Sequence, residues 1–161
     1  MIYDYVVIGS GFGGSVASLR LVEKDYKVLT IEQGKRFHPG DFPKTNWNLP
    51  KYLWIPALRF FGFQKLSFFT NASILSGTGV GGGSLVYGNT LYIPPDEFFR
   101  NDIWSYFGDW KKILEPFYDR ASFMLGRKKY TRLNIEDQVL EEVSKDMNVH
   151  STFDTVHVGH E

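Results

Sequence analysis

The chain has 161 residues, and its 18 lysine and arginine side chains balance its 18 aspartate and glutamate side chains. A formal net charge of zero gives no overall field that would attract nucleic acid or an acidic substrate. The sequence contains no cysteine, which excludes disulfides, thiol catalysis and cysteine-bound metals. Met1 to Asp4 lie directly before the first apolar run, and no apolar run is long enough to cross a bilayer, so we expect a soluble, cytoplasmic protein.

The amino-terminal residues predict a strand, a helix and a second strand in that order. Residues 5–8 (Tyr-Val-Val-Ile) are a short β-branched apolar run, typical of a buried parallel strand. The run Gly-Ser-Gly-Phe-Gly-Gly follows at residues 9–14, and residues 15–24 contain no glycine or proline and can form a helix. Residues 27–31 are the second strand, with Glu32 at its carboxyl end. This order predicts a βαβ dinucleotide-binding unit.

Each position of this motif has a physical task. Gly9 allows a tight turn out of the strand, Gly11 leaves no side chain between the backbone and a pyrophosphate, and Gly14 lets the helix pack closely on the sheet. The pyrophosphate would meet free N–H groups and the positive end of the helix dipole. Glu32 can accept hydrogen bonds from ribose hydroxyls and would repel a 2′-phosphate, which disfavours NADP. The alternative is an ordinary glycine-rich turn.

A long aromatic and mainly basic segment follows the second strand. Four prolines, at positions 39, 43, 50 and 56, prevent a long helix, so residues 51–61 can form one short helix at most. Residues 66–75 are predicted to be one strand, and residues 85–93 a short helical turn followed by a strand.

The last third of the chain is predicted to be mainly helical. The helical segments are residues 96–99, 110–125 and 134–147. Asn134 is the expected N-cap of the last one, where Glu136 and Asp137 favour the positive end of the helix dipole.

A second glycine-rich run, Gly-Thr-Gly-Val-Gly-Gly-Gly-Ser, occupies residues 77–84. Successive glycines can turn several backbone N–H groups inward and let a flat cofactor approach the main chain without meeting Cβ atoms. A flexible loop is the alternative, but the apolar flanks favour an ordered, buried loop.

Together, residues 7–15, Glu32 and residues 77–86 resemble the amino-terminal part of the glucose-methanol-choline oxidoreductases, and most closely their cholesterol-oxidase-like branch. The resemblance extends to about Gly126 and includes the Phe-Tyr-Asp-Arg-Ala sequence at residues 117–121.

This resemblance implies FAD as the cofactor and oxidation of an alcohol by hydride transfer to the flavin. Phe12 and Gly13 would contact the pyrophosphate and Glu32 the adenosine ribose, while Gly83 and Gly88 would lie along the isoalloxazine ring. Two positions depart from the family pattern: Tyr87 stands where an asparagine or histidine is usual, and Thr78 where a basic residue is common. The expected cofactor-binding set is Gly9, Gly11, Phe12, Gly13, Gly14, Glu32, Gly79, Gly83, Tyr87 and Gly88.

The resemblance also implies an α/β fold, with an incomplete Rossmann-type FAD- or NAD(P)-binding βαβ domain and the start of a mixed α+β substrate domain. We divide the chain into residues 1–93 and 94–161, with residues 35–70 as a lid or extension. The catalytic histidine and asparagine of the family are expected beyond Glu161. The chain is therefore interpreted as an amino-terminal fragment, inactive alone, that packs against the rest of its parent protein. The three late histidines, His150, His157 and His160, are interpreted as core or surface residues.

Two other classes of function stay open. An NAD-dependent oxidoreductase or a disulfide-reductase-type flavoprotein would share the first motif, although the lack of a cysteine pair disfavours the reductase and the second glycine run disfavours both. Alternatively, the aromatic and basic residues 37–69 could form a non-catalytic lipid- or membrane-surface-binding module. In the leading interpretation the substrate is an alcohol, for example a sterol, and residues 37–69 either cover the substrate cavity, with transient membrane contact, or pack an interdomain core.

Overall fold

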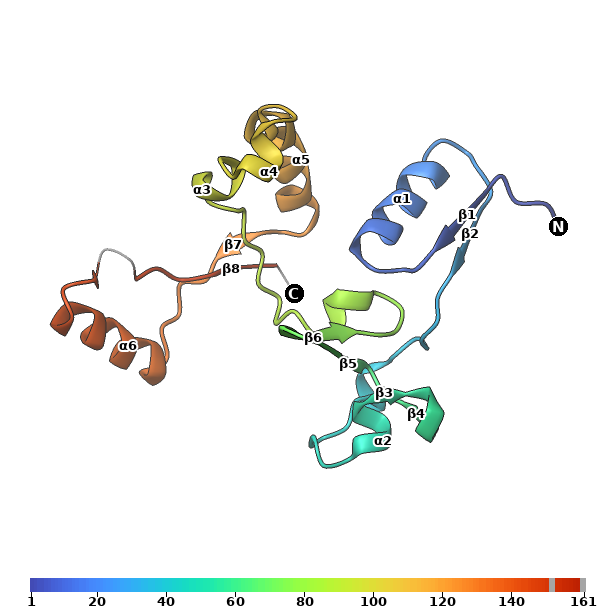
Figure 1. The fold of residues 1–161 in the computed structure, drawn as a ribbon, viewed down its shortest axis with the longest axis horizontal. Coiled ribbons are helices and arrows are strands. Elements are labelled where there is room, and N and C mark those ends of the chain that lie inside the picture. Colours follow the sequence, from blue (N-terminus) through green and yellow to red (C-terminus); the bar gives the residue numbers. More distant parts are fainter. Residues whose placement is uncertain (151–152, 160–161) are drawn as a thin grey trace. The chain divides into compact units, whose positions relative to one another are not determined.

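The computed structural model describes residues 1–150 and 153–159, and the chain divides into two compact units. The amino-terminal unit comprises residues 1–88 and the carboxyl-terminal unit residues 89–161. Each unit combines short helices with small two-stranded sheets, so the fold is mixed α/β (Figure 1).

The amino-terminal unit begins with the predicted strand–helix–strand order. Strand β1 (Tyr5–Ile8) and strand β2 (Val28–Ile31) are parallel and in register from Tyr5↔Val28 to Ile8↔Ile31. Helix α1 (Phe12–Val22) connects them and begins three residues earlier than predicted. Gly11 has an extended backbone and acts as the N-cap, so the glycines at 13 and 14 lie inside the first helical turn.

Helix α1 covers one face of the β1–β2 pair. The Ser18 hydroxyl on the helix lies 2.8 Å from the Thr30 hydroxyl on β2, which fixes the covered face. Because side chains alternate along a strand, Val6, Ile8 and Ile31 point to the opposite face. Their exposed fractions are 56%, 87% and 50%, so this outer sheet face is open to solvent.

The aromatic segment folds around one buried ring. Phe63 is 9% exposed, and the rings of Phe37, Phe42 and Tyr52 surround it at centroid distances of 6.1, 5.2 and 5.3 Å, all edge to face. We call these four rings the Phe63 cluster. The short elements that bring them together are a 3-10 turn (Pro39–Asp41), α2 (Leu49–Tyr52), β3 (Trp54–Ile55), a second 3-10 turn (Pro56–Leu58) and β4 (Phe60–Phe61), which pairs antiparallel with β3. As predicted, residues 51–61 contain no long helix.

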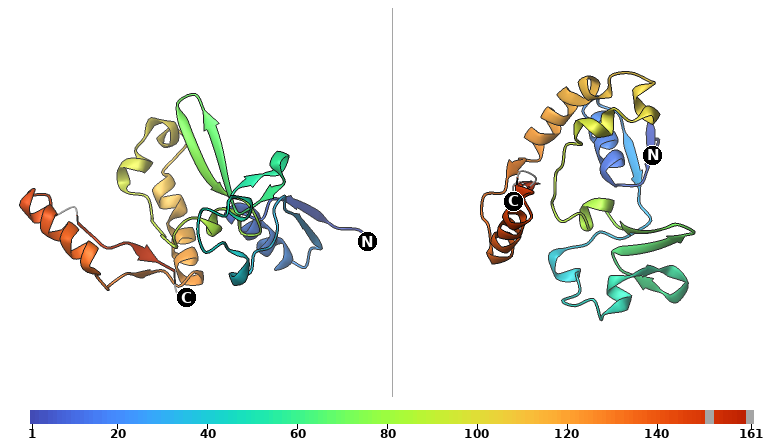
Figure 2. Two further views of the ribbon diagram at one scale, coloured as in Figure 1. Left: turned by 90° about the horizontal axis from the view of Figure 1, so that it is seen from below. Right: turned by 60° about the vertical axis from the view of Figure 1, so that its left-hand side comes forward.

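The predicted single strand at residues 66–75 is wrong, because the chain reverses within it. Strands β5 (Gln64–Phe69) and β6 (Ala72–Gly77) form an antiparallel hairpin in which Phe69 pairs with Ala72. Thr70 and Asn71 are the two-residue connection, and this pair of turn-forming polar residues interrupts the apolar run. Figure 2 shows the hairpin as an elongated two-stranded ribbon.

The prediction for residues 85–93 is mostly wrong. A 3-10 turn (Gly82–Leu85) ends at the first residue of this segment, and the expected strand is reduced to a single bridge between Thr90 and Val158. The backbone explains the loss: Gly88 and Asn89 have φ angles of 64° and 57°, which bend the chain out of an extended path.

The carboxyl-terminal unit contains the three predicted helices, together with one helix, α4, and two short strands that were not predicted. Its elements are α3 (Asp96–Phe99), α4 (Asp102–Ser105), α5 (Trp110–Met124), β7 (Lys128–Lys129), α6 (Ile135–Asp146) and β8 (His157–Val158), with β7 and β8 antiparallel. The Asn134 cap is confirmed, since its side chain accepts a hydrogen bond from the Asp137 amide and the Asp137 carboxylate accepts one from the Asn134 amide. This reciprocal pair is a capping box.

Little apolar surface is enclosed in either unit. Among the described residues, only Phe63 and Phe99 are buried apolar side chains, at 9% and 8% exposure. No helix within residues 1–150 and 153–159 is long and apolar enough to cross a membrane. The exposed apolar side chains are therefore distributed over short elements, and they do not form one long hydrophobic helix.

Candidate functional site

The first glycine loop (residues 9–14) has the backbone that its sequence motif requires. Gly9 has φ +90°, a conformation that favours glycine, and it turns the chain sharply out of β1. A Cβ atom at Gly14 would overlap the carbonyl oxygen of Gly9, so only glycine allows α1 to start this close to the strand. At Gly11 and Gly13, by contrast, a Cβ would meet nothing within 4 Å. Open space therefore lies over the two glycines expected beside a pyrophosphate.

Helix α1 begins within this loop, with Gly11 as its N-cap. The first N–H groups of an α-helix have no partner inside the helix, and the helix dipole is positive there. Gly11 provides no side-chain cap. An anionic group next to the loop would supply the missing acceptors.

Glu32 is held in a fixed orientation at the carboxyl end of β2. Its Oε2 accepts hydrogen bonds from the Ser10 amide at 2.9 Å and the Ser10 hydroxyl at 2.8 Å, and its Oε1 accepts one from the Gly34 amide at 2.9 Å. Burial raises the pKa of Glu32, but the hydrogen bonds from Gly34, Ser10 and Gln33 outweigh it and hold that pKa below its ordinary value. The carboxylate is thus ionised near neutral pH and able to accept further hydrogen bonds.

The second glycine loop (residues 77–84) lies directly against the first. A Cβ at Gly82 would come within 2.8 Å of the Gly11 Cα, and a Cβ at Gly83 within 3.0 Å of the Phe12 ring. The Tyr87 ring also packs on Phe12, edge to face, at a centroid distance of 5.6 Å. The structure therefore brings two segments about 70 residues apart in sequence into one site, with Ser10 Oγ and the Gly81 amide 3.3 Å apart across it.

Gly79 and Gly88 have surroundings of a different kind. Gly79, at φ +143°, lies where a Cβ would come within 2.8 Å of the Lys35 carbonyl oxygen and of the Phe37 ring, so its role in packing is plain. Gly88, at φ +64°, has nothing within 4 Å of a Cβ and is the last residue of the amino-terminal unit. Their contact with a cofactor stays a prediction.

Thr78 carries the clearest sign of a missing partner at the second glycine loop. The residue is 2% exposed, and its hydroxyl has no hydrogen-bond partner among the residues that the structure describes. Buried hydroxyl groups are nearly always hydrogen-bonded. The binding of a dinucleotide such as FAD fits three features of this site. They are an unsatisfied hydroxyl in the second loop, open space over the first loop and an oriented carboxylate.

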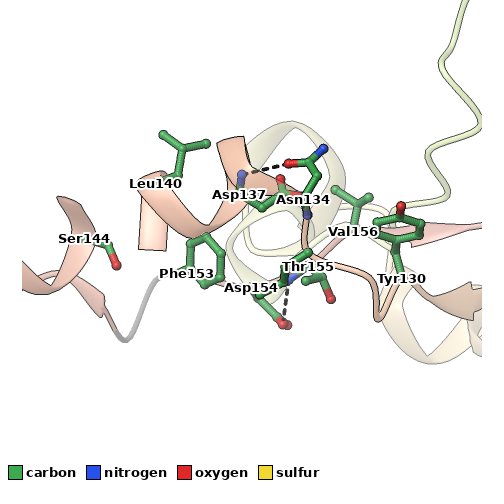
Figure 3. A pocket seen from close by; sticks show the side chains of 10 residues that line it. Tyr130, Asn134, Asp137, Leu140, Ser144, Phe153, Asp154, Thr155 and Val156 are labelled. Atoms are coloured by element: carbon green, nitrogen blue, oxygen red, sulfur yellow. Dashed lines mark hydrogen bonds between the residues drawn. The ribbon is translucent and has the colours of Figure 1, made fainter. Parts of the chain in front are cut away.

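Two cavities of the carboxyl-terminal unit include none of these residues. One, of about 550 Å³, lies beside α6 and is lined by Leu140 and Ser144 on that helix and by Phe153 to Val156 (Figure 3). Another, of about 410 Å³, is an aromatic hollow between α3, α4 and α5. Of the late histidines, His150 lies 3.3 Å from the Ser144 hydroxyl, whereas His160 is outside the described residues.

The chain is similar to proteins with a known activity. Cholesterol oxidase of Mycobacterium tuberculosis (strain H37Rv) is 46% identical over 157 residues, and cholesterol oxidase of Acinetobacter baumannii is 39% identical over 157 residues. Both matches cover 98% of this chain but only 27% and 28% of the relative. The chain belongs to the glucose-methanol-choline oxidoreductase family.

Other members of the family match shorter parts of the chain. A long-chain-alcohol oxidase of Arabidopsis thaliana is 31% identical over 106 residues, which cover 63% of this chain and 13% of the relative. No protein-family model matches the chain. The chain thus spans about a quarter of the length of the cholesterol oxidases, and it matches their amino-terminal portion.

The sequence analysis missed three residues that complete this site. Ser10 is the unspecified position of the first motif, Gly34 follows the acidic residue, and Gly81 was seen only as part of a run. A signal for Ser10 was present, because the carboxyl ends of neighbouring parallel strands meet at one edge of a sheet. A serine after β1 and a glutamate after β2 are therefore neighbours. No comparable signal identified Gly81.

Proposed function

We propose that the amino-terminal unit binds FAD and that the chain is the amino-terminal part of a flavin-dependent oxidoreductase. The observation that carries this proposal is the contact between the two glycine loops beside an oriented Glu32 carboxylate. The family is generally flavin-dependent, which supports FAD over NAD. In this role the Rossmann-type domain of the sequence analysis would consist of β1, α1 and β2, completed by strands from the rest of the protein.

The proposed binding mode assigns a task to each part of the site. Glu32 would accept hydrogen bonds from the adenosine ribose, and the open space over Gly11 and Gly13 would receive the pyrophosphate at the start of α1. Gly83 and Tyr87 would lie toward the isoalloxazine ring, with Phe12 packed between the two loops. Together these residues would orient the cofactor and exclude water from it.

The proposed substrate is an alcohol with a large apolar body, for example a sterol. When bound, FAD would supply the hydride acceptor that oxidation of the alcohol to a carbonyl compound requires. The names of the relatives, cholesterol oxidase and long-chain-alcohol oxidase, support this class of substrate. The catalytic residues are expected in the part of the protein that this chain does not include.

A flavin absorbance spectrum of the complete protein tests the cofactor. We expect the flavin bands in the purified protein and their bleaching when cholesterol is added without an electron acceptor. Glu32→Ala should weaken FAD binding by roughly 1.5–3 kcal/mol, the usual effect of losing a hydrogen bond to a charged group. Gln33→Ala, at the neighbouring exposed position, is the control and should bind FAD like the wild type. A protein that binds NAD and no flavin would replace this proposal with the NAD-dependent alternative.

The β5–β6 hairpin favours a second role for the amino-terminal unit, contact with the surface that delivers an apolar substrate. Phe68 and Phe69 at the end of the hairpin are 77% and 62% exposed, and Lys65 precedes them on the same strand. Exposed aromatic rings and a basic residue on one strand suit transient contact with an anionic membrane. Sedimentation with phosphatidylserine vesicles tests this idea: Phe68→Ser should bind less than the wild type, and equal binding would reject it.

A further inference from the structure

Ser10 is a buried serine in the first glycine loop. It lies between Gly9 and Gly11, at the variable position of the first motif, and it is 8% exposed. Buried hydroxyl groups require hydrogen-bond partners. The partners of Ser10 come from three different segments of the amino-terminal unit.

The Ser10 side chain makes two of these contacts, as donor in one and as acceptor in the other. Its hydroxyl donates to Glu32 Oε2 at 2.8 Å, and the same oxygen accepts from the Gly81 amide at 3.3 Å. The backbone carbonyl of Ser10 also accepts from the Ser15 hydroxyl of α1 at 2.8 Å. One buried side chain therefore connects the first glycine loop, the end of β2 and the second glycine loop.

A hydroxyl can make both side-chain contacts at once. The Glu32 carboxylate is an acceptor and the Gly81 amide is a donor, so the group between them has to donate to one and accept from the other. Alanine would keep the backbone amide that donates to Glu32, but it would leave the Gly81 amide without the serine oxygen. It would also leave the carboxylate with fewer restraints on its orientation.

We propose that Ser10 is a positioning residue that couples the two halves of the dinucleotide site. It holds the Glu32 carboxylate ready for a ribose, and it ties the second glycine loop to the first, so that each half is ordered by the other. This inference rests on the proposed dinucleotide function. Its physical basis is pre-organisation: groups held in place before binding lose less freedom when the ligand arrives.

The first test is an FAD titration of the cofactor-free complete protein, followed by flavin fluorescence. Ser10→Ala should bind FAD about 10-fold more weakly, or worse, because a hydrogen bond to a charged group is lost. Ser18→Ala is the control: it removes a serine hydroxyl too, in this case one on α1 with its hydrogen bond to Thr30, but it touches neither loop. Ser10→Thr, which retains a hydroxyl, should restore binding and so separates a lost hydrogen bond from a lost fold.

A double-mutant cycle tests whether Ser10 acts through Glu32. In a Glu32→Ala background, Ser10→Ala should weaken FAD binding by less than about threefold, since the carboxylate it positions is gone. An equal effect of Ser10→Ala in both backgrounds would overturn the coupling.

Amide hydrogen exchange of the cofactor-free protein gives a readout that needs no ligand. Ser10→Ala should accelerate exchange at Gly81, and Ser18→Ala should not. Unchanged exchange at Gly81 would refute the link between the loops.

A wild type that binds neither FAD nor NAD would refute the proposed function, and with it the positioning role. A wild type that binds FAD no better than Ser10→Ala would refute the role of Ser10 alone.

Discussion

Within the amino-terminal unit, the two glycine loops differ from the β5–β6 hairpin and the outer sheet face in how far the chain itself satisfies their side chains. The glycine loops are joined by polar contacts that involve a few atoms with fixed directions, such as those of Ser10 with Glu32 and Gly81. The β5–β6 hairpin and the outer sheet face present apolar side chains for which the described residues provide no cover, with Ile8 at 87% and Phe68 at 77% exposure. The difference indicates that the candidate cofactor site is specified within the chain, whereas the apolar surfaces require additional protein or a ligand.

The largest expected effect comes from separating the chain from the rest of its protein. Residues 1–161 alone should show no oxidation of cholesterol and should associate in solution, because large apolar surfaces stay exposed. Size-exclusion chromatography and binding of a hydrophobic dye measure the association. A monomer with a cooperative thermal transition would contradict this expectation and show that both regions are complete.

The Phe63 cluster allows buried and exposed aromatic rings of the amino-terminal unit to be compared. Phe63→Ala in the complete protein should lower the free energy of unfolding by about 3–5 kcal/mol, as expected for removing a buried aromatic ring. Phe68→Ala, the same change at an exposed ring, should alter it by no more than about 0.5 kcal/mol. Chemical denaturation measures both. Similar losses would show that the hairpin ring is covered in the complete protein.

Two neighbouring glycines provide a matched pair in the polar region. Gly14→Ala would place a Cβ on the Gly9 carbonyl oxygen and should cost about 1–3 kcal/mol of stability, the usual range for overpacking. Gly13→Ala adds its Cβ in open space and should be neutral or stabilising by up to about 1 kcal/mol, since alanine favours a helix. The effect on FAD binding should differ from the effect on stability: Gly13→Ala should weaken FAD binding although the fold is intact. Thermal midpoints with and without FAD check both statements.

The smallest expected effect is the pH dependence of Glu32. Its pKa in the folded protein lies below the ordinary value of 4.5, so its stabilising hydrogen bonds are fully present above that pH. Their contribution should be lost as the pH falls through the lower, folded value. Wild type and Glu32→Gln should therefore differ most in urea midpoint near neutral pH and converge in acid. A difference that grows on acidification would show that the carboxylate is not held as described.

Local signals in the sequence predicted the parts of the fold that depend on neighbouring residues. The glycine motif predicted the βαβ order, and Asn134 predicted the start of α6, because a turn and a cap are both decided within a few residues. The hairpin was missed for a different reason. Its residues have strong strand propensity on both sides of Thr70 and Asn71, so the apolar pattern concealed a two-residue turn.

Long-range contacts were beyond the sequence analysis. Among many aromatic residues, nothing in the sequence distinguishes Phe63, which is surrounded by rings, from Phe68, which is exposed. The approach of Gly82 to Gly11 likewise depends on packing between segments that are distant in the chain. The strands β7 and β8 are two residues each, too short for any periodicity to predict. The cofactor contacts of the whole predicted set, from Gly9 to Gly88, stay predictions.

The sequence separations within the candidate site also set an order of assembly during synthesis. The hydrogen bond between Ser10 and Glu32 spans 22 residues, so the first glycine loop and its acid can meet soon after β2 is made. The bond between Ser10 and Gly81 spans 71 residues and has to wait for the aromatic segment and the hairpin to be translated. During synthesis, the first glycine loop and Glu32 can therefore form their part of the site before the second glycine loop has been translated.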